Sequence, residues 1–473
     1  MSTRSFFISA THKSSGKTTI ALALAAAFAE EGKAVQTFKK GPDYIDPMWL
    51  GRASGVPCRN LDFHTQTPDG IRDYFLHIAG GSDLAIVEGN KGLFDGVDVS
   101  GSDSNAALAS LLELPVVLVV DTRGITRGIA PLIHGYRTFA PSVTIAGVIL
   151  NQVGGPRHEK KMRAAIAQYT DVPVLGAIGR YPEMQITERH LGLTPTNEAG
   201  AVDTIIAASA AIVRDNVDLA AVLDVGRDLP AKTAGRRSPV GAGMKDLRIG
   251  VARDEAFGFY YADDLECLER GGAELCFFDT QQDARLPDVD GLFIGGGFPE
   301  THAAELAANK PLLAEIAAAL RGGLPAYAEC GGLMYLSRNL TWQGHRHEMV
   351  GFLPGDTMMH DKPVGRGYVR LARTANALWP AAGETGAVLP AHEFHYASLE
   401  NLPPGQTFAF DVVRGYGIDG EHDGLIVGNL LACFSHQRCV PGRRWTEPFV
   451  QFIRACKNRR GSPGDPYQAH NSP

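Results

Sequence analysis

Two stretches of this chain carry residues whose types and spacing could do chemistry. The first, Ser9-Ala10-Thr11-His12-Lys13-Ser14-Ser15-Gly16-Lys17-Thr18-Thr19, lies between an apolar run at 5–8 and an alanine-rich stretch at 18–31. A loop that joins a strand to a helix N-terminus presents N–H groups and a positive dipole end to an anion. We therefore predict a phosphate loop that binds ATP, with Lys17 on the phosphates and the Thr18 hydroxyl on Mg²⁺. The predicted nucleotide-binding residues are Lys13, Ser14, Ser15, Gly16, Lys17, Thr18 and Thr19.

This loop departs from the pattern G-x-x-x-x-G-K-[ST], because Thr11 stands where the first glycine is expected. It also carries a second lysine, Lys13, four residues before Lys17. The combination resembles the variant loop of MinD, the nitrogenase iron protein and dethiobiotin synthetase. The alternative interpretation is a Ser/Gly turn with two solvated lysines.

The second stretch is centred on Cys330 in Pro-Ala-Tyr-Ala-Glu-Cys-Gly-Gly-Leu-Met-Tyr. A short strand, a turn of small residues and a helical segment are typical of an elbow that exposes a nucleophile. A helix N-terminus lowers the pKa of a thiol, which favours the nucleophilic thiolate. The N–H of Gly331 and one from 295–297, which we assign to Gly296, are candidates for an oxyanion hole. An inert buried cysteine is the alternative.

A thiolate nucleophile needs a histidine, and three are candidates: His392, His395 and His436. The residues alone do not rank them. Cys433, His436 and Cys439 also have a spacing that could bind a metal, although zinc would need a fourth ligand.

Acidic residues follow two of the predicted strands. Asp43 and Asp46 lie in Lys-Lys-Gly-Pro-Asp-Tyr-Ile-Asp-Pro after a strand at 34–38, where they could ligate Mg²⁺, orient a substrate or stabilise a turn. Glu88 closes a strand at 84–87, the arrangement of a Walker-B carboxylate. Asn151 ends a strand at 144–150 and is expected either to read adenine or to cap a helix.

The alternation of strands and helices predicts two doubly wound α/β domains. Strands at 116–120, 144–150 and 174–178 extend the first of them. The expected boundaries are a phosphate-loop domain at 1–225, a linker at 226–245, a second domain at 246–455 and a disordered tail at 456–473.

Composition narrows the class of protein. The chain has 473 residues, 44% hydrophobic and 21% charged, as expected for two or three globular domains. A net charge of −7 argues against a nucleic-acid partner, and the absence of a long apolar run or signal peptide predicts a cytoplasmic protein without a membrane partner. Seven scattered cysteines do not suggest a disulfide framework.

Four motifs in the first half, THKSSGKTT, FKKGPDYIDP, NLDF and VEGNKGLFDG, resemble the amidotransferase family of cobyrinic and hydrogenobyrinic acid a,c-diamide synthases. The second half resembles class I glutamine amidotransferases of the cobyrinic and cobyric acid synthase type. Their histidine lies in Ser-Tyr-x-His-x-His, which matches His436, but Phe434 and Arg438 depart from that pattern.

The resemblance implies a ligase with glutamine, ATP and a tetrapyrrole as substrates. ATP would phosphorylate a carboxylate, and ammonia released by Cys330 and His436 would displace the phosphate. It implies a metal set of Thr18, Asp43 and Glu88 and substrate contacts at Asp46, Asn90 and Asp95. A homodimer is a possible assembly.

Two alternatives remain. The sequence differs from that of a standard corrin enzyme at three places, which are Met48-Trp49-Leu50, Cys58 and the altered segment 434–438. Because of these differences, amidation of sirohaem stays an alternative reaction. A MinD-like ATPase switch shares the phosphate loop but has no use for a thiol elbow.

Overall fold

The computed structural model describes residues 2–189, 192–230, 245–379 and 385–460. By internal contacts the chain divides into two units, Met1–Arg237 and Ser238–Pro473. Most of the expected linker and tail lies outside the described residues.

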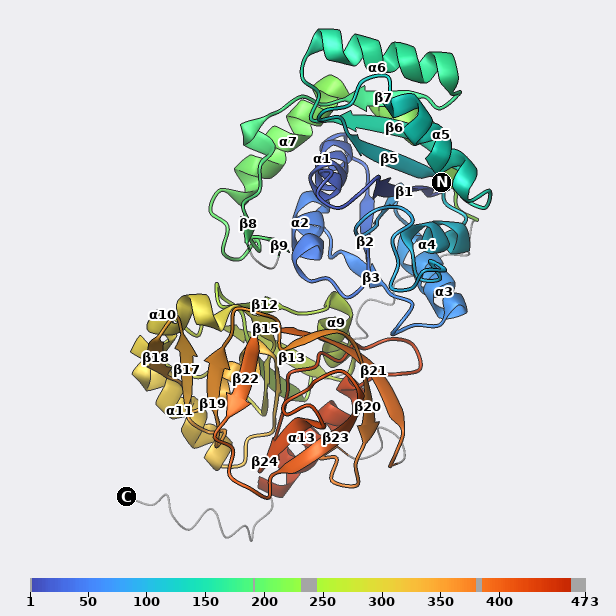
Figure 1. Ribbon diagram of the computed structural model, residues 1–473. Coiled ribbons are helices and arrows are strands. Elements are labelled where there is room, and N and C mark those ends of the chain that lie inside the picture. Colours follow the sequence, from blue (N-terminus) through green and yellow to red (C-terminus); the bar gives the residue numbers. More distant parts are fainter. Residues whose placement is uncertain (1, 190–191, 231–244, 380–384, 461–473) are drawn as a thin grey trace. The chain divides into compact units, whose positions relative to one another are not determined.

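The first unit is built on strands that are buried on both faces, as β5 with its sequence Val-Val-Leu-Val-Val-Asp illustrates. Seven strands pair in parallel in the order β3-β2-β4-β1-β5-β6-β7 (Figure 1). Their bounds are β1 (Arg4–Ala10), β2 (Val35–Lys40), β3 (Arg59–Leu61), β4 (Leu84–Glu88), β5 (Val116–Asp121), β6 (Ile145–Asn151) and β7 (Val174–Ala177). Since all point the same way, their carboxyl ends share one edge, where ligands bind in such sheets.

Helices cover both faces of this sheet. On one face α1 packs against α2 and α7, and nine consecutive residues of the alanine-rich α1 are buried. On the other face α3 to α6 share one apolar core with the strands. The bounds are α1 (Lys17–Glu30), α2 (Ile45–Ser54), α3 (Pro68–Ala79), α4 (Asn105–Leu112), α5 (Ile129–Phe139), α6 (Pro156–Tyr169), α7 (Val202–Asn216) and α8 (Leu219–Asp224). The short elements are η1 (Pro182–Met184), β8 (Glu188–Arg189) and β9 (Gly192–Leu193).

The start of the expected linker belongs to the first sheet. β10 (Arg227–Asp228) pairs antiparallel with β1, and the N–H of Leu229 donates to the carbonyl of Thr3. A two-residue strand is too short to show an apolar periodicity, so the sequence pattern misplaced this boundary.

The second unit has a nine-stranded mixed sheet in the order β13-β11-β14-β16-β25-β24-β23-β20-β21. The first five strands are parallel and the rest antiparallel. Their bounds are β11 (Leu247–Ala252), β13 (Ala273–Phe278), β14 (Gly291–Ile294), β16 (Ala326–Glu329), β20 (Gly365–Arg373), β21 (Val388–His395), β23 (Thr407–Arg414), β24 (His422–Val427) and β25 (Leu430–Cys433). The doubly wound expectation thus describes the parallel part of the sheet and missed the antiparallel extension.

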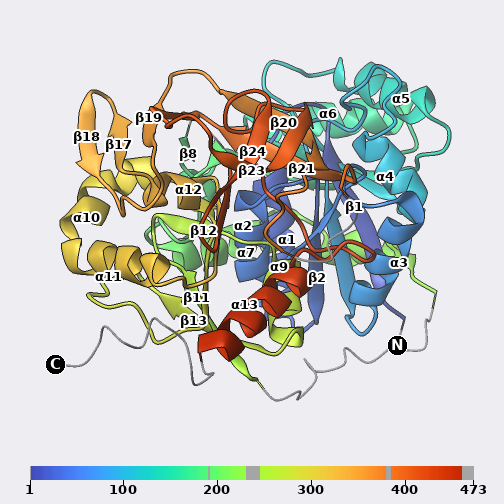
Figure 2. The ribbon, with the colours of Figure 1, turned by 90° about the horizontal axis from the view of Figure 1, so that it is seen from below.

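Two layers of helices enclose this sheet. On one face α9 (Ala262–Arg270) lies beside α13 (Thr446–Arg460), as Figure 2 shows. The other face carries η2 (Pro299–His302), α10 (Ala303–Ala308), α11 (Lys310–Arg321) and α12 (Gly331–Leu336). Two small sheets are formed by β12 (Phe257–Phe259) with β15 (Gly296–Gly297), and by β17 (Asn339–Trp342), β18 (His345–Glu348), β19 (Asp356–Met359) and β22 (Ala397–Glu400).

The expected tail begins too early in the chain. Helix α13 continues to Arg460, so residues 456–460 are helical. Ile453 and Cys456 on this helix are buried. Within the described ranges, no helix combines the length and apolar character that crossing a membrane requires.

Candidate active site

The predicted phosphate loop lies between β1 and α1. Gly16 has φ of 83°, in the left-handed region that favours glycine, and a Cβ there would lie 2.2 Å from Nδ2 of Asn151. That amide donates to the carbonyl of Ser15 at 2.9 Å. Asn151 therefore braces the loop from the end of β6, while Lys13 is exposed on the loop.

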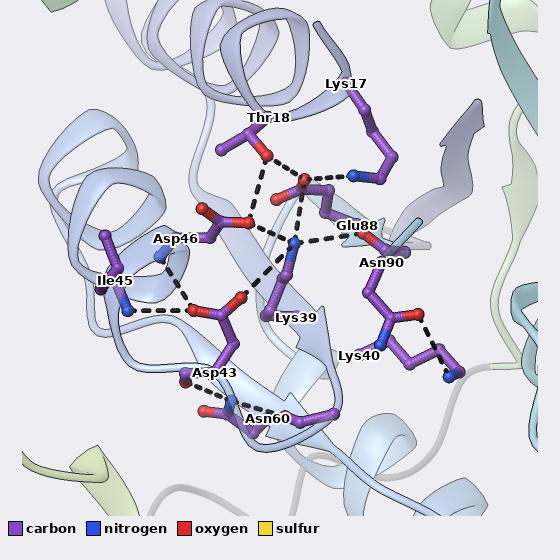
Figure 3. A network of polar contacts seen from close by, with 12 residues as sticks. Lys17, Thr18, Lys39, Lys40, Asp43, Ile45, Asp46, Asn60, Glu88 and Asn90 are labelled. Atoms are coloured by element: carbon purple, nitrogen blue, oxygen red, sulfur yellow. Dashed lines mark hydrogen bonds and ion pairs between the residues drawn. The ribbon is translucent and has the colours of Figure 1, made fainter. Parts of the chain in front are cut away.

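Thr18, in the first turn of α1, meets two carboxylates (Figure 3). Its Oγ1 lies 2.6 Å from Oε1 of Glu88 and 3.1 Å from Oδ2 of Asp46. Lys17 Nζ lies 3.2 Å from the same Glu88 oxygen. The second oxygen, Glu88 Oε2, is buried and has no hydrogen-bond partner among the described residues, so a carboxylate oxygen is left for a further ligand.

Lys39 completes this cluster, although the sequence had not singled it out. Its Nζ lies 2.5 Å from Asp46 Oδ2 and 3.1 Å from Glu88 Oε1 (Figure 3). Burial alone would lower the pKa of Lys39, but Asp46 and Glu88 outweigh it and raise the pKa. Burial, followed by the charge of Lys39, lowers the pKa of Lys17 despite Glu88. Lys39 is the penultimate residue of β2 and lies beside Glu88 in the register with β4, a pairing that the sequence does not reveal.

The two aspartates of the GPDYIDP motif have contacts that differ from those expected. Asp43 Oδ1 accepts from the N–H groups of Ile45 at 3.0 Å and Asp46 at 3.1 Å, which is the turn role left open above. Its Oδ2 lies 4.0 Å from Lys39 Nζ. Burial, with the charge of Asp46, raises the pKa of Asp43 to about 7. Asp46, rather than Asp43, contacts Thr18; burial would raise its pKa, but Lys39 and Lys17 lower it.

The other two expected substrate contacts lie outside this cluster. Lys40 Nζ donates to Oδ1 of Asn90 at 3.3 Å. Asp95 is exposed and accepts from the N–H of Gly92 at 2.9 Å, closing its own turn. The structure therefore brings together Thr18, Asp46 and Glu88, and places Asn90 and Asp95 at a neighbouring loop.

The second predicted site is a strained turn between β16 and α12. Cys330 has φ of 49° and ψ of −102°, and its N–H donates to the carbonyl of Cys433 at 2.7 Å. A Cβ on Gly332 would lie 2.2 Å from the carbonyl oxygen of Ile294, and one on Gly331 would lie 3.1 Å from the backbone nitrogen of Gly297. The close packing requires glycine at 332 and leaves little room for a side chain at 331, which holds the thiol at the elbow.

His436 lies beside this thiol. It is hydrogen-bonded to Cys330, and its Nδ1 lies 3.4 Å from Oε2 of Glu329. Burial would lower the pKa of His436, but the hydrogen bonds and charges of Cys330 and Glu329 raise it to about 10. A Cβ on Gly296 would lie 2.8 Å from the imidazole Cε1, so the expected oxyanion strand is adjacent to the same ring.

The other two histidines have different surroundings. His392 stacks on His436 with ring centroids 4.8 Å apart, and the two backbones are hydrogen-bonded. His395 stacks on Phe434 at 4.1 Å and its Nδ1 contacts the carbonyl of Ala397 at 2.7 Å. The geometry favours His436 as the partner of the thiol.

Glu329 is a site residue that the sequence analysis missed. Its Oε1 accepts from the hydroxyl of Tyr327 at 2.6 Å and from the N–H of Gln437 at 2.9 Å, which fixes the carboxylate against His436. Its position directly before the nucleophile was the available signal. Cys433 and Cys439 are buried, and His436 between them is already engaged by Cys330 and Glu329, which argues against the metal alternative at these residues.

A phosphate loop with buried carboxylates in one unit and a Cys–His–Glu arrangement in the other define a nucleotide-binding glutamine amidotransferase. Residues 6–193 match the CobQ/CobB/MinD/ParA nucleotide binding domain, and residues 248–442 match the CobB/CobQ-like glutamine amidotransferase domain. The chain belongs to the cobyrinate a,c-diamide synthase family, and is a carbon–nitrogen ligase that takes its nitrogen from glutamine.

Family membership follows from relatives named cobyrinate a,c-diamide synthase. The protein of Magnetococcus marinus is 44% identical over 97% of this chain and 98% of its own. That of Methanosarcina acetivorans is 42% identical over 94% of each chain, and one from Dehalococcoides mccartyi is 40% identical over 91% of this chain and 94% of its own.

Proposed function

We propose that this protein converts peripheral acetate carboxylates of cobyrinate into amides, using ATP to activate each carboxylate and glutamine as the source of ammonia. The observation that carries the proposal is the presence, in one chain, of the Thr18–Asp46–Glu88 cluster at a phosphate loop and of the Cys330–His436 pair. A nucleotide switch of the MinD kind would need only the first of these. The relatives' name and their nearly full-length match support the choice of substrate.

Ammonia release is assigned to the second unit. The Cys330 thiolate attacks the side-chain amide carbon of glutamine, and the carbonyl electrons move onto oxygen, where N–H groups of Gly331 and the Gly296–Gly297 strand are available. The His436 imidazolium gives its proton to the leaving nitrogen, so ammonia departs and a thioester remains. Water then hydrolyses the thioester to glutamate with His436 as the base.

Carboxylate activation is assigned to the first unit. Lys17 and the loop N–H groups would hold the phosphates of ATP, and a carboxylate oxygen of the substrate attacks the terminal phosphorus while ADP leaves. Ammonia then attacks the acyl carbon, phosphate leaves and the amide forms. The neighbouring Asn90 and Asp95 stay candidates for substrate contacts, and Asn151 stays a candidate for contact with the adenine of ATP.

The buried cluster also fits Mg²⁺. Three carboxylates, Asp43, Asp46 and Glu88, face the ammonium groups of Lys17 and Lys39, and Glu88 Oε2 has no partner in the described ranges. Oxygen ligands of this kind suit Mg²⁺. We assign the metal to Thr18, Glu88 and Asp46, with Asp46 replacing Asp43 in the expected set. Bound there with ATP, the ion would neutralise charge on the transferring phosphoryl group.

Most of the features that had kept sirohaem as an alternative lie in the protein core, and Met48 is half-buried. Trp49 and Leu50 are fully buried, and the Trp49 indole donates to the carbonyl of Thr194 at 2.9 Å. Cys58 is buried, and Arg438 pairs with Asp263 at 3.1 Å. These residues therefore do not favour sirohaem over cobyrinate.

The test is to incubate the protein with MgATP, glutamine and, separately, cobyrinic acid, hydrogenobyrinic acid and sirohaem, and to weigh the products by mass spectrometry. We expect a diamide from cobyrinic acid and none from sirohaem. Lys17→Ala is the matched control, since it should make no amide. If only sirohaem gave an amide, the substrate would be sirohaem rather than cobyrinate. ATP hydrolysis without any amide product would overturn the proposed function.

A further inference from the structure

The second unit contains a cavity of about 550 Å³ that is distinct from the nucleophile site, because Cys330 and His436 are not among its lining residues. Its walls come from the end of β20 and the residues that follow it, from β21, β23 and β25, and from the segment after β25 together with the first turn of α13. Small-molecule sites in proteins have volumes in this range, roughly 300 to 1,000 Å³. The residues that decide its chemistry are Arg373, Trp379, Arg443 and Trp445.

Three buried N–H donors on the lining residues lack an acceptor. These are Nη1 of Arg373 and the indole Nε1 atoms of Trp379 and Trp445, none of which has a hydrogen-bond partner in the described part of the protein. The three side chains are 5 to 7% exposed. Buried polar groups are nearly always hydrogen-bonded, so three orphaned donors around one cavity indicate a missing acceptor.

The cavity also carries positive charge without a matching carboxylate. Arg373 donates through Nη2 to the carbonyl of Trp379, a neutral acceptor, and burial lowers its pKa. Among the described residues, no carboxylate pairs with Arg373 or with Arg443 at the rim, and burial is the only influence on the pKa of each. Glu447, the one carboxylate among the described lining residues, is 2.8 Å from Arg444. A guanidinium buried without a counter-ion is costly, and it is the group proteins use to bind carboxylates and phosphates.

Part of the remaining wall is aromatic and apolar. The rings of Trp379 and Trp445 are stacked with centroids 5.9 Å apart, and Phe410 and Leu389 line the cavity beside them. A ligand would therefore combine an anionic head with a flat apolar body.

We propose that this cavity is a binding site for a small organic anion, in which a carboxylate or phosphate accepts hydrogen bonds from Arg373 and the two indoles while an aromatic body packs against the apolar walls. The site lies next to Gln437, whose N–H holds Glu329, so its occupant would contact the segment that carries His436.

The test is calorimetric titration of the full chain with phenyl phosphate, benzoate, inorganic phosphate and benzyl alcohol. We expect saturable binding of phenyl phosphate or benzoate, tighter than inorganic phosphate or the neutral alcohol. Arg373→Gln removes a charge-assisted donor and should weaken binding roughly tenfold or more. Trp445→Phe keeps an aromatic, though smaller, side chain and leaves the charge of Arg373 in place but removes one donor, and should weaken binding less.

The matched control is Arg321→Gln on α11, which is not a lining residue and should bind like wild type. Melting curves without ligand establish whether each variant is folded. If Arg373→Gln does not fold, the comparison of Trp445→Phe with wild type still tests the proposal. Absence of saturable binding to wild type would overturn the proposal. So would binding that Arg373→Gln and Trp445→Phe leave unchanged, or equal affinity for benzyl alcohol and benzoate.

Discussion

Replacing Glu329 by glutamine should move the alkaline limit of glutamine hydrolysis. The change keeps the size of the side chain and removes the charge that lies 3.4 Å from Nδ1 of His436. At this distance two unit charges attract by roughly 5 kcal/mol if the effective dielectric constant is about 20. Tyr327 and Gln437 donate to the same carboxylate and reduce its effect on the imidazole.

An opposite charge this close typically changes a pKa by about 1 to 3. We therefore expect Glu329→Gln to lower the pKa of His436 from about 10 to roughly 8. The leaving ammonia needs a proton from the imidazolium, so kcat/KM for glutamine should fall above about pH 8 in the variant and only near pH 10 in wild type.

The assay is glutamate release measured across this pH range. Tyr327→Phe is the matched control, because it removes a hydrogen bond to Glu329 without removing charge, and its profile should stay close to wild type. An unchanged alkaline limit in Glu329→Gln, or an equal displacement in Tyr327→Phe, would refute the role given to this carboxylate.

The other predictions concern both sites. Cys330→Ala should abolish glutamine-driven amidation but spare amidation with ammonium chloride; loss of both in a folded variant would contradict the division of labour. His436→Ala should slow labelling of Cys330 by a glutamine-like electrophile by roughly a hundredfold, the lower range of general-base effects, whereas His392→Ala should change it little; the reverse order would assign the role of base to His392. Asp46→Asn should raise the Mg²⁺ concentration needed for half-maximal synthesis more than Asp43→Asn does, and equal effects would contradict the metal set. Because the pKa of His436 is raised in the folded protein, its protonation stabilises the fold fully below the unfolded pKa of about 6.5, and this contribution is lost as pH rises through about 10. Between these two pH values the melting temperature of His436→Gln should therefore fall less than that of wild type. Parallel melting-temperature curves for the two proteins would refute the ion pair.

The phosphate loop and the thiol elbow were visible in the sequence because each depends on local geometry. Gly16 and Gly332 are needed for backbone conformation and close packing, so residue types alone mark them. The contacts of Asp43 and Asp46 depend instead on where α2 begins. Asp43 turns its oxygen to the first N–H groups of that helix, which leaves Asp46, one residue into it, to face Thr18.

The contacts of Lys39 with Glu88 and of Glu329 with His436 depend on the order of the strands in the sheets, which the sequence does not give. Lys39 reaches Glu88 because β2 and β4, separated by α2, β3 and α3 in the chain, are neighbours in the sheet. Glu329 reaches His436 because β25 pairs with β16. The antiparallel half of the second sheet was missed for a related reason, since no described helix separates its strands and the repeating strand–helix pattern ends after α12.

The central claim is that the first unit activates a carboxylate by transferring a phosphoryl group to it. The direct measurement uses cobyrinic acid labelled with ¹⁸O in its carboxylates, MgATP and ammonium chloride, so that the glutaminase is not needed, and follows the label by ³¹P NMR. The account predicts that one ¹⁸O appears in inorganic phosphate for each amide formed, and that Lys17→Ala forms neither product. Amide formation with unlabelled phosphate, or with the label in AMP, would contradict it.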